Sequence, residues 1–194
     1  MTKMKFGKRG LSQVVTTLIL LVVSVLLAGI VTYYATNITM TRTEQEEVDI
    51  SKAHIWVNST GGAEAAFVVE GLGGRDILID KITVRGVECS WSSVYFNRTS
   101  SSITSDLTYH RPNAANGYDP SKTKSDWNVT IGGSTWLLNA ASNDIDVPSS
   151  YSVLFYILSP DNIDLDDIGT PVSITVFTKN GQWIEEVNVE YAGS

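Results

Sequence analysis

A long apolar segment close to the N-terminus dominates the hydrophobic pattern. Residues 11–35 read LSQVVTTLILLVVSVLLAGIVTYYA, and no charged residue occurs between Gly10 and Thr41. At about 1.5 Å rise per residue this stretch forms a helix of roughly 37 Å, longer than the roughly 30 Å hydrocarbon core of a membrane. We expect a hydrophobic helix over residues 11–48 whose last turns are polar.

From about Asp49 the pattern changes to the alternation of β-strands separated by glycine-containing turns. The strand-like segments are 53–57, 65–69, 77–84, 91–96, 136–138, 152–158, 172–177 and 183–189. Residues 100–133 read as long loops with one or two short strands. Asn180-Gly181 between two alternating segments is the strongest hairpin signal in the chain.

About seven to nine short strands and one long helix predict an α+β protein. We expect a long N-terminal hydrophobic α-helix followed by a mainly antiparallel β-sandwich of immunoglobulin-like character. The expected organisation is a basic segment over 1–10, the helix over 11–48 and a globular β-sandwich domain over 49–194.

The distribution of charged residues along the chain predicts how the helix is oriented in a membrane. Four of the fourteen basic residues lie in the first nine positions. This favours a cytoplasmic N-terminus, with the domain outside the cell and Tyr33 and Tyr34 at a membrane interface. The chain has a net charge of −7. Without the four basic residues, ten basic face 21 acidic residues, a charge of about −11 that argues against nucleic-acid binding.

The junction between the basic and apolar segments reads Lys8-Arg9-Gly10-Leu11-Ser12. Together with Gln13 and the uncharged aliphatic helix, this junction resembles the class III leader of archaeal type IV pilins and archaellins, over roughly the first 50 residues. The resemblance implies that a prepilin-type peptidase recognises Lys8 and Arg9 and cuts between Gly10 and Leu11.

The resemblance also implies a function. Freed helices would leave the membrane and pack into a homo-oligomeric helical filament, built by pilus assembly machinery and used for adhesion or surface contact. Ser24, Ala28 and Gly29 are the small residues that would let helices approach closely. Bacterial pilins carry a glutamate where this chain has Val15, and the early glycine-rich pattern of archaellins is missing, so an archaeal pilus subunit is favoured over an archaellum subunit.

Two other readings of the helix remain. A secretory signal has an apolar region of about 7–15 residues followed by a small-x-small cut site. This segment is longer and has Tyr33 at the position that needs a small residue. A plain membrane anchor holding a non-polymerising extracellular binding domain stays as the alternative.

Four Asn-x-Ser/Thr sequons are candidate N-glycosylation sites on a domain outside the cell: Asn37, Asn58, Asn97 and Asn128. Asn37 is the least favoured of them because it is close to the helix that would be packed.

Candidate chemistry is sparse, so we expect no enzyme, no metal site and no cofactor. Cys89 is expected to be a small buried residue. The acidic run 161–167 lacks the glycine and terminal glutamate of an EF-hand, and Ile163 and Leu165 alternate within it like core residues. His54 and His110 have no partner at a triad or zinc spacing. Trp127 lies in a polar loop where it could be exposed.

Overall fold

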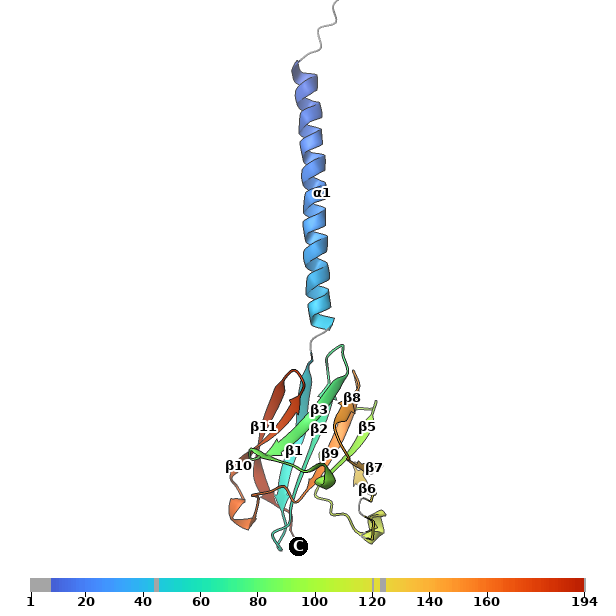
Figure 1. The fold of residues 1–194 in the computed structure, drawn as a ribbon, viewed down its shortest axis with the longest axis vertical. Helices are drawn as coiled ribbons and strands as arrows, with labels where there is room; N and C mark the ends of the chain where they lie inside the picture. Colours follow the sequence, from blue (N-terminus) through green and yellow to red (C-terminus); the bar gives the residue numbers. More distant parts are fainter. Residues whose placement is uncertain (1–7, 44–45, 120, 123–124, 194) are drawn as a thin grey trace, which may run out of the picture. The chain divides into compact units, whose positions relative to one another are not determined.

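The computed structural model describes residues 8–43, 46–119, 121–122 and 125–193. The chain divides into two compact units, 1–43 and 44–194, and each is described by itself. The described part of the first unit is the helix α1 (Lys8–Thr43), of 36 residues. Helix α1 and most of the strands are labelled in Figure 1.

The helix ends earlier than the sequence led us to expect. We predicted a helix to about Val48, but α1 ends at Thr43 and Val48 is the first residue of β1. Val48 is buried in the core of the second unit and pairs with Gly71. Burial of this side chain in a sheet therefore outweighs the helical charge pattern on which the prediction rested.

The second unit is built from eleven strands in the part of the chain that is described. They are β1 (Val48–Val57), β2 (Ala63–Gly71), β3 (Ile77–Val84), β4 (Val87–Glu88), β5 (Val94–Thr99), β6 (Trp127–Ile131), β7 (Ser134–Ala140), β8 (Ile145–Val147), β9 (Ser152–Leu158), β10 (Pro171–Thr178) and β11 (Gln182–Tyr191). Three short 3-10 helices lie between them: η1 (Trp91–Ser93), η2 (Ala114–Asn116) and η3 (Leu165–Asp167).

The strands follow the order β4-β3-β10-β11-β1-β2-β9-β5-β7-β6, and β8 pairs with β3. Every pairing is antiparallel except the parallel contact of β1 with β11 at Ile55↔Val189. The predicted α+β class, a long helix followed by a mainly antiparallel β domain, is confirmed. The number of strands exceeds the predicted seven to nine because β4 and β8 are too short to show a period. The immunoglobulin-like sandwich stays a prediction.

The Asn180-Gly181 hairpin is confirmed. Strands β10 and β11 are antiparallel with Phe177 opposite Gln182, and Thr178 N–H donates to the Gly181 carbonyl at 2.9 Å. The Glu46 carboxylate accepts from Thr178 Oγ1 at 2.8 Å and from Asn180 Nδ2 at 2.6 Å. These contacts join the C-terminal hairpin to the beginning of the domain.

Two hydrophobic clusters occupy opposite faces of β2 and β9. The first contains the stacked rings of Phe67 and Phe155, 5.2 Å apart, and also side chains of β3 and β10. The second contains Trp127 and Tyr156 and is covered by Ile103 and Leu107 from the segment between β5 and β6. Trp127 is fully buried, so the expectation that it could be exposed is wrong. Its indole packs edge-on against Tyr95 and Tyr156.

Replacing Phe155 with alanine tests the first cluster. Because the ring is fully buried, we expect Phe155→Ala to lower the free energy of unfolding by about 3–5 kcal/mol. Urea unfolding followed by tryptophan fluorescence measures the loss. Leu137→Ala, at a side chain with 48% exposure, is the control and should change the free energy by less than about 0.5 kcal/mol. Equal losses in both variants would contradict this assignment of the core.

Candidate functional site

Helix α1 exposes many large apolar side chains along its described length. Seventeen large hydrophobic residues between Val14 and Met40 are exposed, among them Leu21 at 60% and Val31 at 65%. The span Ser12–Thr41 is long and apolar enough to cross a membrane, and none of it is buried within the chain. At about 1.5–3 kcal/mol for each side chain buried, removing this surface from water is worth tens of kcal/mol. The surface therefore needs a lipid or protein environment.

The Ser and Thr hydroxyls between Thr16 and Thr41 are compatible with that environment. From Thr16 to Thr41, every Ser and Thr hydroxyl donates to a carbonyl of its own helix three or four residues earlier, at 2.8–2.9 Å. A hydroxyl bonded in this way carries no unsatisfied donor into an apolar medium. The helix can thus be buried in an apolar environment without leaving these hydroxyl groups unpaired.

The predicted packing residues Ser24, Ala28 and Gly29, which we call the small-residue strip, lie within an arc of about 140° on this surface. Ser24 and Ala28 are about one helical turn apart. Gly29 lines an open depression on the helix surface together with Val25, Ile30 and Tyr33. A Cβ added at Gly29 would meet nothing within 4 Å. The backbone of Lys8, Arg9 and Gly10, on the N-terminal side of the predicted cut, lies in the first turn of α1, followed by Leu11. The side chains of this junction lie outside the described residues.

The four sequons differ in their surroundings. Asn37 is exposed on α1. Asn58 is half-buried, and its Oδ1 accepts from Thr60 N–H, Thr60 Oγ1 and Gly62 N–H, while Nδ2 donates to Tyr109 Oη at 3.1 Å. Asn97 Nδ2 donates to the Leu137 carbonyl at 2.7 Å. Asn128 is exposed on β6.

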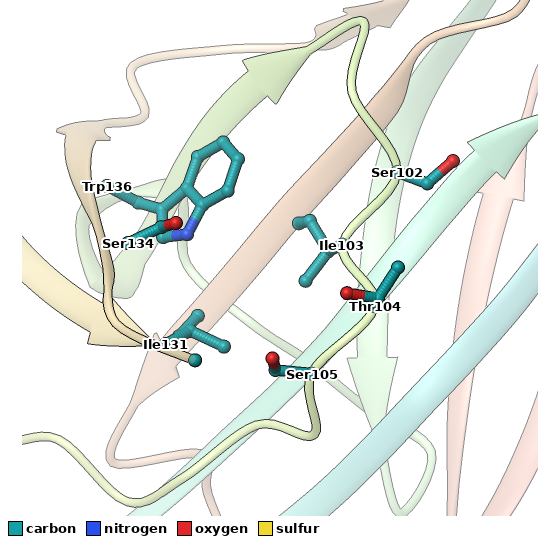
Figure 2. A pocket seen from close by; sticks show the side chains of 8 residues that line it. Ser102, Ile103, Thr104, Ser105, Ile131, Ser134 and Trp136 are labelled. Atoms are coloured by element: carbon teal, nitrogen blue, oxygen red, sulfur yellow. The ribbon is translucent and has the colours of Figure 1, made fainter.

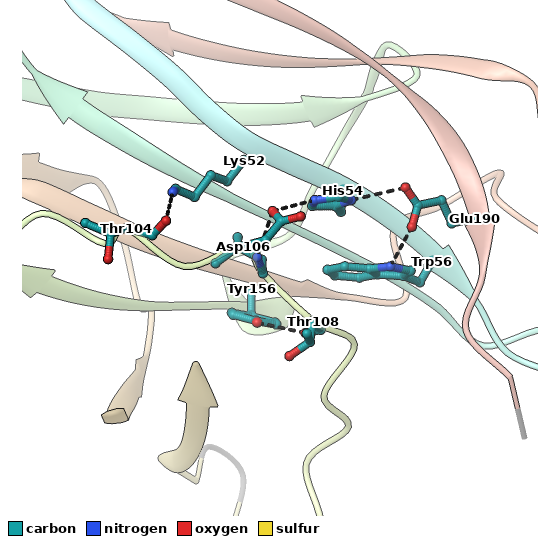
Figure 3. Close-up of polar contacts among 9 residues, drawn as sticks. Lys52, His54, Trp56, Thr104, Asp106, Thr108, Tyr156 and Glu190 are labelled. Atoms are coloured by element: carbon teal, nitrogen blue, oxygen red, sulfur yellow. Dashed lines mark hydrogen bonds and ion pairs between the residues drawn. The ribbon is translucent and has the colours of Figure 1, made fainter. Parts of the chain in front are cut away.

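His54 lies between two carboxylates whose proximity was not predicted from the sequence (Figure 3). Its Nε2 is 2.9 Å from Asp106 Oδ1, and its Nδ1 is 3.2 Å from Glu190 Oε1. The ring stacks on Trp56, whose Nε1 donates to Glu190 Oε2 at 3.1 Å. The hydrogen bond from His54 lowers the pKa of Asp106. The partners are 52 and 136 residues away in sequence, so no local spacing could reveal this cluster.

Glu64 is a second feature that sequence reasoning missed. It is fully buried on β2, where Oε1 accepts from His110 N–H at 2.8 Å and Oε2 has no partner among the described residues. Burial raises the pKa of Glu64 to about 8, while the His110 hydrogen bond and the Arg111 charge pull the pKa down. Burial also raises the pKa of Tyr156, whose hydroxyl donates to the Thr108 carbonyl. These contacts hold the segment 108–111 over the sheet.

A hollow of about 100 Å³ lies between the β6–β7 turn and residues 102–105 (Figure 2). Hydroxyl side chains of Ser102, Thr104 and Ser105 border it, and Trp136 faces them across Ile103. Pockets for small molecules measure about 300–1,000 Å³, and one water takes about 30 Å³ of liquid volume. This hollow therefore has room for a few water molecules and not for a sugar.

Within the described residues, no three His, Cys, Asp or Glu side chains are placed to hold a metal ion. In the acidic run 161–167, Asp164 caps η3 and Asp167 pairs with Arg85 at 2.7 Å. Ile163 is buried, but Leu165 is exposed, so its predicted alternation as a core residue is wrong. Cys89 is a free, buried cysteine, as expected, and burial raises its pKa to about 11.

Comparison with protein-family models gives no match, and comparison with curated proteins gives none either. Among solved structures, one chain that matches comes from the structural analysis of a family 123 glycoside hydrolase from Clostridium perfringens, which concerns glycolipid glycan hydrolysis. The identity is 10%, the TM-score is 0.28, and the match covers 76% of this chain and 27% of that chain. A likeness at that level supports no statement about fold or activity.

The buried Glu64 carboxyl predicts a pH dependence of stability. The folded protein keeps this proton up to about pH 8, whereas the unfolded chain releases it near the ordinary value of 4.5. Between these values the unfolded state binds fewer protons, so stability falls as pH rises, by about 1.4 kcal/mol per pH unit at most. Glu64→Gln should remove this part of the slope in urea unfolding measured at pH 5, 6, 7 and about 8.

The matched control is Glu70→Gln, a partly buried glutamate on the same strand, which should keep the wild-type slope. Parallel stability curves for the wild type and Glu64→Gln would show that Glu64 is not held protonated.

Proposed function

We propose that this chain is the structural subunit of an extracellular filament of the archaeal type IV pilus kind, which polymerises through α1 and serves adhesion or surface contact. Its proposed role is structural and not catalytic. The proposal rests on the resemblance of the leader junction, and the single observation that carries it furthest is the exposure of seventeen large hydrophobic side chains along the charge-free stretch of α1 between Gly10 and Thr41.

The proposed assembly follows from the chemistry of that helix. While the basic leader is attached, its charges hold the N-terminus on the cytoplasmic side of the membrane. Cleavage after Gly10 leaves a helix that begins at Leu11 and has no charged side chain before Arg42. Such a helix can leave the lipid when copies of itself offer an equally apolar surface. The paired hydroxyls of α1 favour this transfer because no hydrogen bond must be broken.

The β domain then supplies the outer surface. Its two clusters are filled by its own side chains, so it needs no helix to complete its core. A domain of this kind can be carried on the outside of a helical assembly while the helices pack inside. Adhesion or surface contact would use the exposed loops and strand faces of this domain.

The first test is the N-terminus of the mature protein. Mass spectrometry of chain recovered from the cell surface should find Leu11 as the first residue. Gly10→Val should leave the leader uncut because the peptidase requires the small residue at the junction. Gly7→Val, the same substitution three positions earlier, is the control and should be cut normally. Surface protein that still begins at Met1 would contradict the proposal.

The second test is the small-residue strip. Since a side chain at position 29 meets nothing within its own chain, Gly29→Leu should leave the single subunit intact and even strengthen its helix. In the filament the larger side chain would separate neighbouring helices. We expect at least about a tenfold drop in chain recovered as sheared filaments, since about 1.4 kcal/mol of lost contact per subunit is enough.

Val23→Leu is the matched control, because position 23 lies about 100° or more around the helix from each of Ser24, Ala28 and Gly29. It should assemble like the wild type. Equal assembly of both variants would show that Gly29 does not face a neighbouring helix. Protein that is membrane-bound, single and never filamentous would favour the anchored binding domain instead.

A further inference from the structure

Asn128 differs from the other sequons in the environment of its side chain. It is exposed at the second position of β6, the last strand in the sheet order, which pairs with β7 alone among the described strands. Thr130, which completes the sequon, is exposed two residues later and so lies on the same face of the strand. We propose that Asn128 carries an N-linked glycan. We also propose that a second hollow, which lies beside Asn128 and is lined by residues between Tyr109 and Asn116, holds the first sugar.

In the other two sequons of the domain, the asparagine side chain already makes hydrogen bonds within the fold. Asn58 makes four of them, including one from its Nδ2 to Tyr109 Oη, and it organises the β1–β2 turn. Asn97 Nδ2 donates to the Leu137 carbonyl at 2.7 Å and so helps join β5 to β7. A sugar on either nitrogen would replace one of its two hydrogens and would place a bulky group beside a contact of the fold. No such contact of the Asn128 amide exists among the described residues.

The hollow beside Asn128 has the size and lining for a sugar. It has a volume of about 480 Å³, which falls within the range of about 300–1,000 Å³ of small-ligand sites. Hydrogen-bonding side chains line most of it: Tyr109, His110, Arg111, Asn113, Asn116 and Thr130. Sugars present many hydroxyl groups, and such a lining offers partners to several of them.

The walls of the hollow are fixed by local structure. Asn113 and Asn116 form a reciprocal capping box at η2, and Asn116 Nδ2 donates to the Arg111 carbonyl at 2.9 Å. The helix ends at Gly117 with φ of 90°, a conformation that favours glycine. The Arg111 guanidinium packs on Gly62, where an added Cβ would lie 2.6 Å from Nη2. The hollow is therefore built before any sugar arrives.

Glycan attachment would proceed by a balanced transfer. The Asn128 amide nitrogen forms a bond to the anomeric carbon of an activated oligosaccharide, whose bond to a lipid-linked phosphate leaving group breaks. The amide nitrogen gives up one proton, which is released to the solvent, while the phosphate leaving group keeps the electron pair of the broken bond. A glycan at this position would shield the outer strand of the sheet, where unpaired backbone groups otherwise invite contact with other chains.

The inference rests on the proposed location outside the cell but not on polymerisation, so it can fail independently. Peptide mapping by mass spectrometry of full-length protein from the cells that make it should find glycan on the peptide containing Asn128. Asn128→Gln and Thr130→Val should both lose it. Thr130→Ser keeps the sequon hydroxyl and should keep the glycan, and Asn58→Gln and Asn97→Gln should leave the glycan on Asn128 unchanged.

Seating of the sugar is tested by amide hydrogen exchange. Residues 109–117 should exchange at least about threefold more slowly in the glycosylated protein than in Asn128→Gln, because the sugar would hold this wall closed. Equal exchange overturns the seating of the sugar in the hollow. A glycan found elsewhere while Asn128 is bare overturns the assignment but leaves the location outside the cell intact. Protein without glycan at any position overturns the inference altogether.

Discussion

The whole structure depends on keeping one long apolar helix away from water. Seventeen large hydrophobic side chains of α1 are exposed within the chain, and their burial is worth tens of kcal/mol. The β domain buries its own hydrophobic residues in two clusters, so its cores are complete without α1. The helix must therefore be covered by lipid or by other proteins. The Ser and Thr hydroxyls from Thr16 to Thr41 are bonded back to helix carbonyls and so are compatible with either environment, and the small residues Ser24, Ala28 and Gly29 would allow neighbouring helices to approach closely.

The elements with strong local signals could be predicted from the sequence. The strands at 77–84 and 152–158 were predicted with the bounds that the structure has, and the Asn180-Gly181 turn placed the last hairpin correctly. The helix end was placed too late because Val48 joins a strand whose partner, Gly71, lies 23 residues further on. Strand β8 is only three residues long, too short for any period to be recognised.

The candidate sites were harder to predict because their partners are distant in sequence. His54 meets Asp106 and Glu190 only after β1, β11 and the segment between β5 and β6 come together. Glu64 stands in an apolar strand, and nothing near it in sequence indicates that it is buried beside His110. Trp127 follows a polar stretch yet fills the second cluster, because that segment folds across the sheet. The leader junction and the sequons, in contrast, are contiguous motifs that can be read directly.

Electron microscopy of material sheared from intact cells, without detergent, distinguishes a filament subunit from a membrane-anchored domain. We expect filaments that contain this chain, in which the helix beginning at Leu11 is surrounded by the same helix from neighbouring copies and no bilayer is present. Recovery of the chain only from the membrane fraction, as single subunits that need detergent, would contradict this expectation.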